Sequence, residues 1–195
     1  MRRSMQVIIT GVVIVITISL VGAVWYLQQH RPQPARQTDA ARFQTEYPRV
    51  AADNRFVYAR DVAVLDVLEH GTGVVFLGYP QCPWCQRLSE YVDQAARAEG
   101  ITAIHYLNIR QARASKNETY QKLVARLAPY LSKDENGQPR IFVPDVTIVK
   151  HGSIVWRYKE EPTGDSAITP DRYWTVERAQ RAVAQLRRAM QTMKQ

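Results

Sequence analysis

Two cysteines, Cys82 and Cys85, stand three positions apart and are the only cysteines in this chain of 195 residues. They enclose Pro83 and Trp84 in the motif Cys-Pro-Trp-Cys. A disulfide between them would close a very short loop, which removes little entropy from the unfolded chain and makes a purely structural role a poor fit. Structural zinc needs four ligands, and a single cysteine pair supplies two. The pattern therefore favours reversible thiol–disulfide chemistry, with two unreactive buried thiols as the alternative.

The two sulfurs are expected to have unequal roles, because the motif lies where a strand turns into a helix. The apolar run 73–79 predicts a strand, and Pro83 falls in the first turn of a helix predicted to reach residue 98. Cys82 then lies at the N-cap, where free N–H groups and the helix dipole stabilise a thiolate and lower its pKa. Cys85 falls on the apolar side of the helix. We therefore expect Cys82 to be the nucleophile and Cys85 the resolving thiol that releases a mixed disulfide.

The residues between the cysteines are expected to tune the pair. Pro83 fixes the turn and removes one N–H donor near the sulfur. Trp84 is predicted to be an apolar side chain that faces substrate, and burial in the core is the alternative. The chemistry needs no metal or other cofactor, because the dithiol or disulfide of Cys82 and Cys85 is itself the redox centre.

The rest of the chain alternates between strand and helix patterns, which predicts an α/β sheet covered on both faces. Short apolar runs predict strands at 56–59, 73–79, 101–107, 141–149 and 153–158. Helical patterns are found at 61–70, at 83–98 and from Thr169 to about residue 193. A further helix is expected after the capping box Ser115-Lys-Asn-Glu118.

The motif and a distant proline together resemble the thioredoxin superfamily. The segment Gly78-Tyr-Pro-Gln-Cys-Pro-Trp-Cys85 follows an apolar run, and Phe142-Val143-Pro144 enters a hairpin about 60 residues later. The resemblance covers residues 56–183 and implies a thioredoxin-like fold, a central mixed sheet flanked by helices. It also implies that Pro144 has a cis peptide bond and lies against the cysteine pair, and that the backbone of Val143 pairs with substrate.

A narrower resemblance, and two departures, qualify that expectation. Residues 106–109, 118–124 and the Val143-Pro144 hairpin are similar to the bacteriocin transport accessory proteins of Gram-positive bacteria. Thioredoxins have a buried aspartate six residues before the first cysteine, where this chain has Phe76. Asp145 follows the proline, where threonine is common, and a carboxylate near the nucleophile would oppose thiolate formation. Both departures weaken the expectation of efficient thioredoxin-type reduction.

The N-terminal part predicts a membrane anchor. Residues 7–27 form a run of 21 residues without a charge, which at about 1.5 Å per residue spans roughly the 30 Å hydrocarbon layer. Arg2 and Arg3 precede it, and the aromatic pair Trp25-Tyr26 lies at its far end, which favours an N-terminus inside and a domain outside. A cleavable signal peptide is the alternative, but the apolar run continues through Leu27 and favours an uncleaved anchor.

The predicted organisation is a cytoplasmic tail at 1–6, a transmembrane anchor at 7–27, a polar spacer at 28–46 and a thioredoxin-like domain at 47–195. The net charge is +8. Basic residues in the last helix fit a solvated face beside an anionic membrane, and they lack the pattern of a nucleic-acid module, so no nucleic-acid partner is expected.

The expected function is that of a single-pass, membrane-anchored extracytoplasmic thiol–disulfide oxidoreductase that acts on protein or peptide cysteines. A membrane redox partner or an exporter is a further candidate partner. One alternative is an accessory or holdase-like partner of a peptide export system, which would expose apolar surface around Trp84 and Val143. Another is copper or haem–thiol handling, which would need a nearby His or Met ligand. The motif does not fix the direction of electron transfer.

Overall fold

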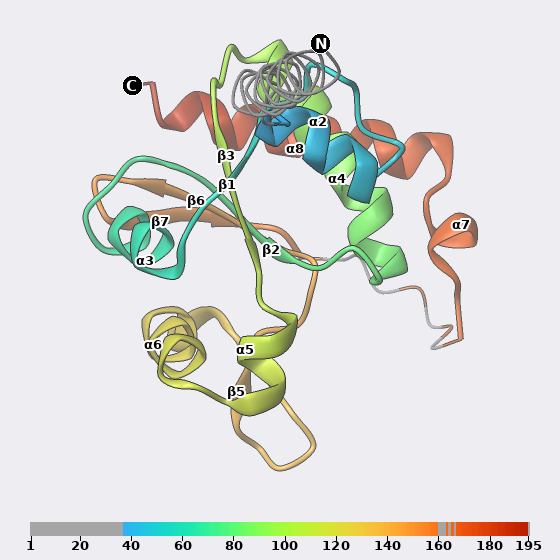
Figure 1. The fold of residues 1–195 in the computed structure, drawn as a ribbon. Helices are drawn as coiled ribbons and strands as arrows, with labels where there is room; N and C mark the ends of the chain where they lie inside the picture. The colour runs from blue at the N-terminus through green and yellow to red at the C-terminus, as the bar shows by residue number, and fades with distance from the viewer. Residues whose placement is uncertain (1–36, 160–162, 164, 166, 195) are drawn as a thin grey trace, which may run out of the picture. The chain divides into compact units, whose positions relative to one another are not determined.

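A five-stranded mixed sheet lies at the centre of the fold (Figure 1). This computed structural model describes residues 37–159, 163, 165 and 167–194. The tail and anchor predicted at 1–6 and 7–27 lie outside these residues. Within the described part of the chain, no helix is long and apolar enough to cross a membrane.

The strands of the sheet are arranged in the order β1-β3-β2-β6-β7. Their bounds are β1 (Phe56–Tyr58), β2 (Gly73–Gly78), β3 (Ile104–Asn108), β6 (Asp145–Lys150) and β7 (Ser153–Arg157). β1, β3 and β2 run parallel, whereas β6 is antiparallel to β2 and β7 is antiparallel to β6. A separate two-stranded ribbon pairs β4 (Ser132–Lys133) with β5 (Pro139–Arg140). The α/β class and the mixed sheet predicted from the sequence are therefore present.

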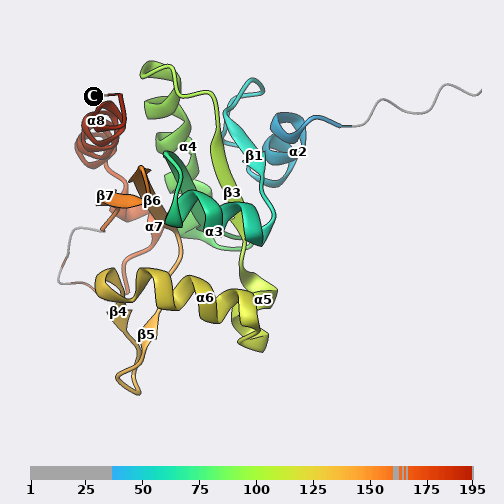
Figure 2. The same cartoon turned by 90° about the vertical axis from the view of Figure 1, so that its left-hand side faces the viewer.

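Helices cover both faces of the sheet, as Figures 1 and 2 show. One layer contains α2 (Asp39–Glu46), α4 (Pro83–Ala98) and α8 (Val176–Thr192), and the other contains α3 (Asp61–Glu69) and α6 (Glu118–Leu127). The shorter helices are α5 (Arg110–Ser115), the 3-10 turn η1 (Ala128–Tyr130) and α7 (Pro170–Tyr173). Strand β2 is buried on both sides because Val74 and Phe76 pack under the first layer, and Val75 and Leu77 under the second.

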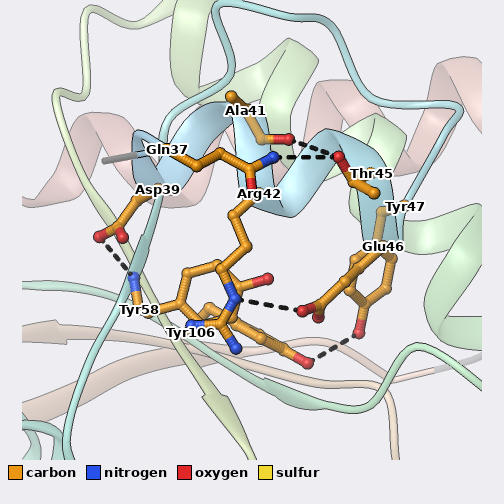
Figure 3. Close-up of polar contacts among 9 residues, drawn as sticks. All are labelled: Gln37, Asp39, Ala41, Arg42, Thr45, Glu46, Tyr47, Tyr58 and Tyr106. Carbon is orange, nitrogen blue, oxygen red and sulfur yellow. Dashed lines mark hydrogen bonds and ion pairs between the residues drawn. The ribbon is translucent and has the colours of Figure 1, made fainter. Parts of the chain in front are cut away.

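Helix α2 was not expected, since it lies within the range predicted as a spacer at 28–46. Thr38 caps it by accepting the N–H of Ala41 at 3.2 Å, and Phe43 is buried between neighbouring aromatic rings. The carboxylate of Asp39 accepts the N–H of Tyr58 on the edge strand β1 at 3.0 Å (Figure 3). The folded domain therefore begins before the predicted boundary at residue 47. The sequence did not predict this helix because most of its residues are polar and only one face is apolar and buried.

Other predicted boundaries also differ from the structure. The single helix predicted from Thr169 to about residue 193 is divided into α7 and α8, because Thr175 caps a new helix. The N-cap of α6 is Asn117, whose side chain accepts the N–H of Tyr120 at 3.0 Å, and Ser115 instead ends α5. The predicted strand at 141–149 begins only at Asp145, and the preceding strand β5 pairs with β4 outside the main sheet. Helix α4 begins at Pro83 and ends at Ala98, as predicted.

Candidate functional site

Cys82 lies at the turn between β2 and α4. It is the N-cap residue of α4, and Pro83 occupies the first position of the helix, as the sequence predicted. The Cys82 sulfur accepts the backbone N–H of Cys85 at 3.1 Å. An N–H aimed at the sulfur from a helix N-terminus stabilises negative charge on it. Cys82 is only 6% exposed, so little of its surface is open to a substrate.

Cys85 is fully buried one turn further along α4, on the same stripe as Leu88, Val92 and Ala95. Burial raises the pKa of its thiol well above the usual range, and the neighbouring Cys82 raises that pKa further. The two sulfurs are not joined by a disulfide in this structure. The two sulfurs therefore differ as predicted, one at the helix end and the other in the core.

The end of β2 is shaped to receive Cys85. A Cβ atom added at Gly78 would lie 3.2 Å from the Cys85 sulfur and 2.7 Å from the Phe76 ring, so glycine permits this close approach. Phe76 is fully buried. An aromatic ring thus occupies the place where the resemblance to thioredoxins would put a carboxylate.

Val143 and Pro144 complete the site from a distant part of the chain. The Cys82 thiol donates to the carbonyl oxygen of Val143 at 3.9 Å. The peptide bond between Val143 and Pro144 is cis, the geometry that the resemblance implies. Both residues are half-buried. The strand pairing explains this arrangement, because Leu77 of β2 lies opposite Asp145 of β6, which brings the starts of α4 and β6 together.

Asp145 does not present a free carboxylate to Cys82, contrary to the concern raised by the sequence. Its side chain is buried and forms an ion pair with Arg157, and it accepts the Thr147 hydroxyl at 2.9 Å. Burial raises the pKa of the Asp145 carboxyl, and both partners oppose that rise. Its negative charge is therefore balanced within the domain, because Arg157 lies on the adjacent strand β7.

Trp84 is half-buried rather than fully exposed. Its ring packs edge-on against Tyr173 of α7, with 5.2 Å between the ring centroids. The side chain thus combines the two alternatives weighed from the sequence, because one part joins the core and another remains accessible beside Cys82. Tyr173 was not anticipated, since nothing in the sequence links it to the motif.

Tyr79 and Arg113 were also missed as neighbours of the cysteines. The carbonyl oxygen of Tyr79 accepts the N–H of Cys82 at 3.1 Å, and its hydroxyl accepts a hydrogen bond from Arg113 at 3.1 Å. Arg113 lies on α5, directly after β3. Because β2 and β3 are parallel neighbours, the segments that follow them meet at one edge of the sheet. That rule was the signal that could have placed Arg113 near the motif.

A cavity of about 540 Å³ lies beside the Val143–Pro144 segment. Among its lining residues are Tyr130, Arg140, Phe142, Val143, Pro144 and Lys159. Phe142 is 50% exposed, which is unusual for a large apolar side chain. The cavity gives the site an open side with aromatic and basic groups.

The histidines considered as metal ligands lie elsewhere. His70 and His151 are exposed, and His105 is half-buried on β3, where burial lowers its pKa. His30 is outside the described residues. Across the described positions, no group of three or more His, Cys, Asp and Glu side chains could hold a metal ion.

The chain was compared with family models and with curated proteins. No family model matches the chain, and no curated protein matches it either. The fold itself, a mixed five-stranded sheet flanked by helices with two cysteines close together at a strand-to-helix turn, is compatible with a thioredoxin-like fold.

Proposed function

We propose that this protein is a thiol–disulfide oxidoreductase in which Cys82 is the nucleophile and Cys85 the resolving thiol. The observation that carries the proposal is the 3.1 Å contact from the Cys85 N–H to the Cys82 sulfur at the first turn of α4. The contact stabilises a thiolate at Cys82, while burial keeps Cys85 protonated until a mixed disulfide forms. The fold supports the finer assignment to the thioredoxin superfamily, which we also propose.

In the reducing direction, the Cys82 thiolate attacks one sulfur of a substrate disulfide. A mixed disulfide forms, and the second substrate sulfur leaves as a thiolate that takes up a proton. Cys85 then loses its proton and attacks the Cys82 sulfur, which releases the first substrate sulfur as a thiol. Two electrons pass to the substrate, and the protein ends with a Cys82–Cys85 disulfide. The reverse sequence oxidises a substrate dithiol.

We further propose that the domain works outside the cell membrane, tethered by residues 7–27, and acts on protein or peptide cysteines without a metal or organic cofactor. The charge-free run and the arginines before it support this arrangement. A membrane-impermeant maleimide tests the location. After treatment with a membrane-impermeant reductant, which opens any Cys82–Cys85 disulfide, it should label Cys82 in intact cells that express the full-length chain. Labelling that requires cell lysis would contradict the proposed side of the membrane.

The enzymatic proposal is tested by trapping. Full-length Cys85→Ala cannot resolve the mixed disulfide, so acid-quenched and alkylated cells should contain adducts on Cys82 that a reductant removes. Cys82→Ala and the double variant serve as matched controls. Absence of adducts from Cys85→Ala, or equal adducts in Cys82→Ala, would overturn the assignment. A redox titration of the wild type then gives the direction, since a potential near about −270 mV indicates a reductant and one near about −120 mV an oxidant.

A second candidate is an accessory partner of a peptide exporter that mainly binds its client. The exposed ring of Phe142 beside Val143 favours this reading, because a large apolar side chain at the surface is suited to binding. The double Cys82→Ala/Cys85→Ala variant separates the two. An accessory protein would keep its export function in that variant, whereas an oxidoreductase would lose it.

A further inference from the structure

Three arginines lie beside residues that adjoin the cysteine pair, namely Tyr79 and the Val143–Pro144 segment, and we refer to Arg110, Arg113 and Arg140 as the arginine rim. Arg110 is exposed and the other two are half-buried. No carboxylate among the described residues lies within ion-pair distance of any of them. Some other arginines of the described domain do pair with a carboxylate, for example Arg97 with Asp53 at 3.0 Å and Arg187 with Glu99 at 2.7 Å. The rim therefore concentrates positive charge that the described domain does not balance by direct pairing.

Arg110 and Arg113 reach the motif through Tyr79. The guanidinium carbon of Arg113 lies 5.3 Å from the centroid of the Tyr79 ring, and that of Arg110 lies 5.8 Å from it. Tyr79 in turn accepts the backbone N–H of Cys82. The positive charge of Arg113 is close enough to oppose the rise in the pKa of Cys85 that burial causes. Arg110 and Arg113 therefore approach Cys82 through one intervening residue, Tyr79.

Arg140 approaches from the other side. Its guanidinium carbon lies 5.3 Å from the centroid of the exposed Phe142 ring, and it lines the same cavity as Val143 and Pro144. Arg113 and Arg140 also line a second cavity, of about 650 Å³, between α6 and the β4–β5 ribbon. Arg140 therefore links the two cavities. Asp134 interacts electrostatically with Arg140 and offsets part of the positive charge of Arg140.

We propose that the arginine rim and Phe142 select substrates in which acidic residues, together with an apolar residue, flank the reactive cysteine. This inference rests on the proposed function and deepens it, since it names the substrate class of the same site. Carboxylates are the protein side-chain groups whose geometry the planar fork of arginine matches. An extended acidic segment bound over the rim would place its cysteine beside Cys82 and its apolar side chain against Phe142.

The inference predicts a charge preference in the rate of disulfide reduction. Complementary charge raises association rates by about 10-fold or more at low ionic strength, and salt screens the effect. Substrates with opposite flanking charge should therefore react at different rates with the same enzyme. Raising the ionic strength to about 1 M should bring those rates together.

The experiment uses the full-length reduced protein in a non-ionic detergent and three peptide disulfides. The peptides differ only in the residues that flank the cysteines, which are aspartate, lysine or serine. Single-turnover rates at low salt should favour the aspartate peptide over the lysine peptide by about 10-fold or more. Rate ratios within a factor of about two would overturn the proposal.

Variants of the rim provide the second test. Arg110→Gln, chosen because Arg110 is exposed, and the pair Arg113→Gln/Arg140→Gln should each lower the ratio of aspartate to lysine rates by about threefold or more. Arg188→Gln is the matched control, since Arg188 is an exposed arginine on α8 beside Arg187, which pairs with the C-cap residue of α4, at the end far from Cys82. If Arg188→Gln lowers the ratio as much as the rim variants do, bulk charge rather than the rim selects the substrate and the proposal fails.

The neutral reagent hydroxyethyl disulfide separates failure of this inference from failure of the proposed function. If the wild type reduces this reagent and all three peptides at similar rates, only the substrate class is wrong. If it reduces none of them and the oxidised protein oxidises none of the corresponding dithiol peptides, both proposals fall. Because each rim variant is compared by its ratio of two peptide rates, a change in the general reactivity of Cys82 cancels.

Discussion

The Cys82 sulfur lies 3.9 Å from the carbonyl oxygen of Val143, although the two residues are 61 positions apart. The contact depends on the antiparallel pairing of β2 with β6, which brings the turn before α4 beside the segment that enters β6. A mixed disulfide on Cys82 would therefore form next to the backbone of Val143. Changes in the pairing of β6 with its neighbours should alter the environment of the Cys82 sulfur.

The buried thiol of Cys85 predicts a pH-dependent stability in the reduced protein. Its pKa is raised above the ordinary value of 9.0. In the unfolded chain this thiol loses its proton as the pH passes 9, whereas the folded domain keeps it, so the stabilising contribution is full below pH 9 and is lost above it.

We expect the unfolding free energy of reduced wild type to fall more steeply than that of Cys85→Ala above pH 9, by about 1.4 kcal/mol per pH unit. Urea denaturation of the full-length chain under reducing conditions measures it. Buried tyrosines such as Tyr47, whose pKa is also raised by burial, are present in both proteins and cancel. Parallel pH profiles for the two proteins would show that Cys85 is not held protonated by the fold.

The ion pair between Asp145 and Arg157 should be essential to the domain. Asp145→Asn leaves the buried guanidinium without its carboxylate, and removing one partner of a buried pair costs about 3–5 kcal/mol. The loss should appear as a lower midpoint of urea denaturation. Glu118→Gln is the control, because it removes an exposed pair with Lys122 at one turn's spacing and should change the midpoint far less. Equal effects of the two substitutions would indicate that Arg157 is well solvated after all.

Two glycines with positive φ allow the cost of backbone strain to be distinguished from the cost of a steric clash. Gly152 has φ +71° and Gly137 has φ +74°. A Cβ added at Gly152 would collide with the carbonyl oxygen of Glu69, whereas one added at Gly137 meets nothing within 4 Å. Both alanine variants incur the left-handed backbone cost of about 1–3 kcal/mol.

Gly152→Ala should therefore lose clearly more thermal stability than Gly137→Ala. The comparison requires only the two melting temperatures of the full-length variants. Similar melting temperatures would mean that the turn between β6 and β7 moves away from α3 at little cost. Arg126, which donates hydrogen bonds to the carbonyl oxygens of Leu68 and Gly152 at 2.7 and 2.5 Å, opposes such a movement.

The cysteine motif could be placed from the sequence because its signals are local. The apolar run before Pro80 predicts β2, Pro83 predicts the start of α4, and the spacing of Cys85 from Leu88 and Val92 predicts its burial. Each of these inferences depends only on residues within one or two turns, so the structure matches them.

The surroundings of the motif could not be predicted in the same way, because they depend on contacts between distant segments. Arg157 neutralises Asp145 only because β7 pairs with β6. Tyr173 reaches Trp84 through a helix nearly ninety positions away along the chain. Helix α2 is polar on most sides, and its role follows from the packing of Phe43 against aromatic residues of β1 and β3.

The hydroxyl groups of Tyr47 and Tyr106 provide the last prediction. They lie 3.2 Å apart, and both side chains are fully buried (Figure 3). Tyr47→Phe or Tyr106→Phe alone leaves the other hydroxyl buried without this partner, which costs about 1–3 kcal/mol. The double Phe variant removes both polar groups, so it should be less destabilised than the sum of the two single variants.

A double-mutant cycle of urea denaturation on the full-length chain measures this coupling, which should be about 0.5–3 kcal/mol. The matched control combines Tyr47→Phe with Gly137→Ala, because the β4–β5 turn shares no contact with α2, and those two changes should add. Additive effects of the tyrosine pair itself would contradict the prediction, since they would mean that each hydroxyl finds water when its partner is removed. In that case the core beneath α2 would be packed loosely enough to admit solvent to the two hydroxyl groups.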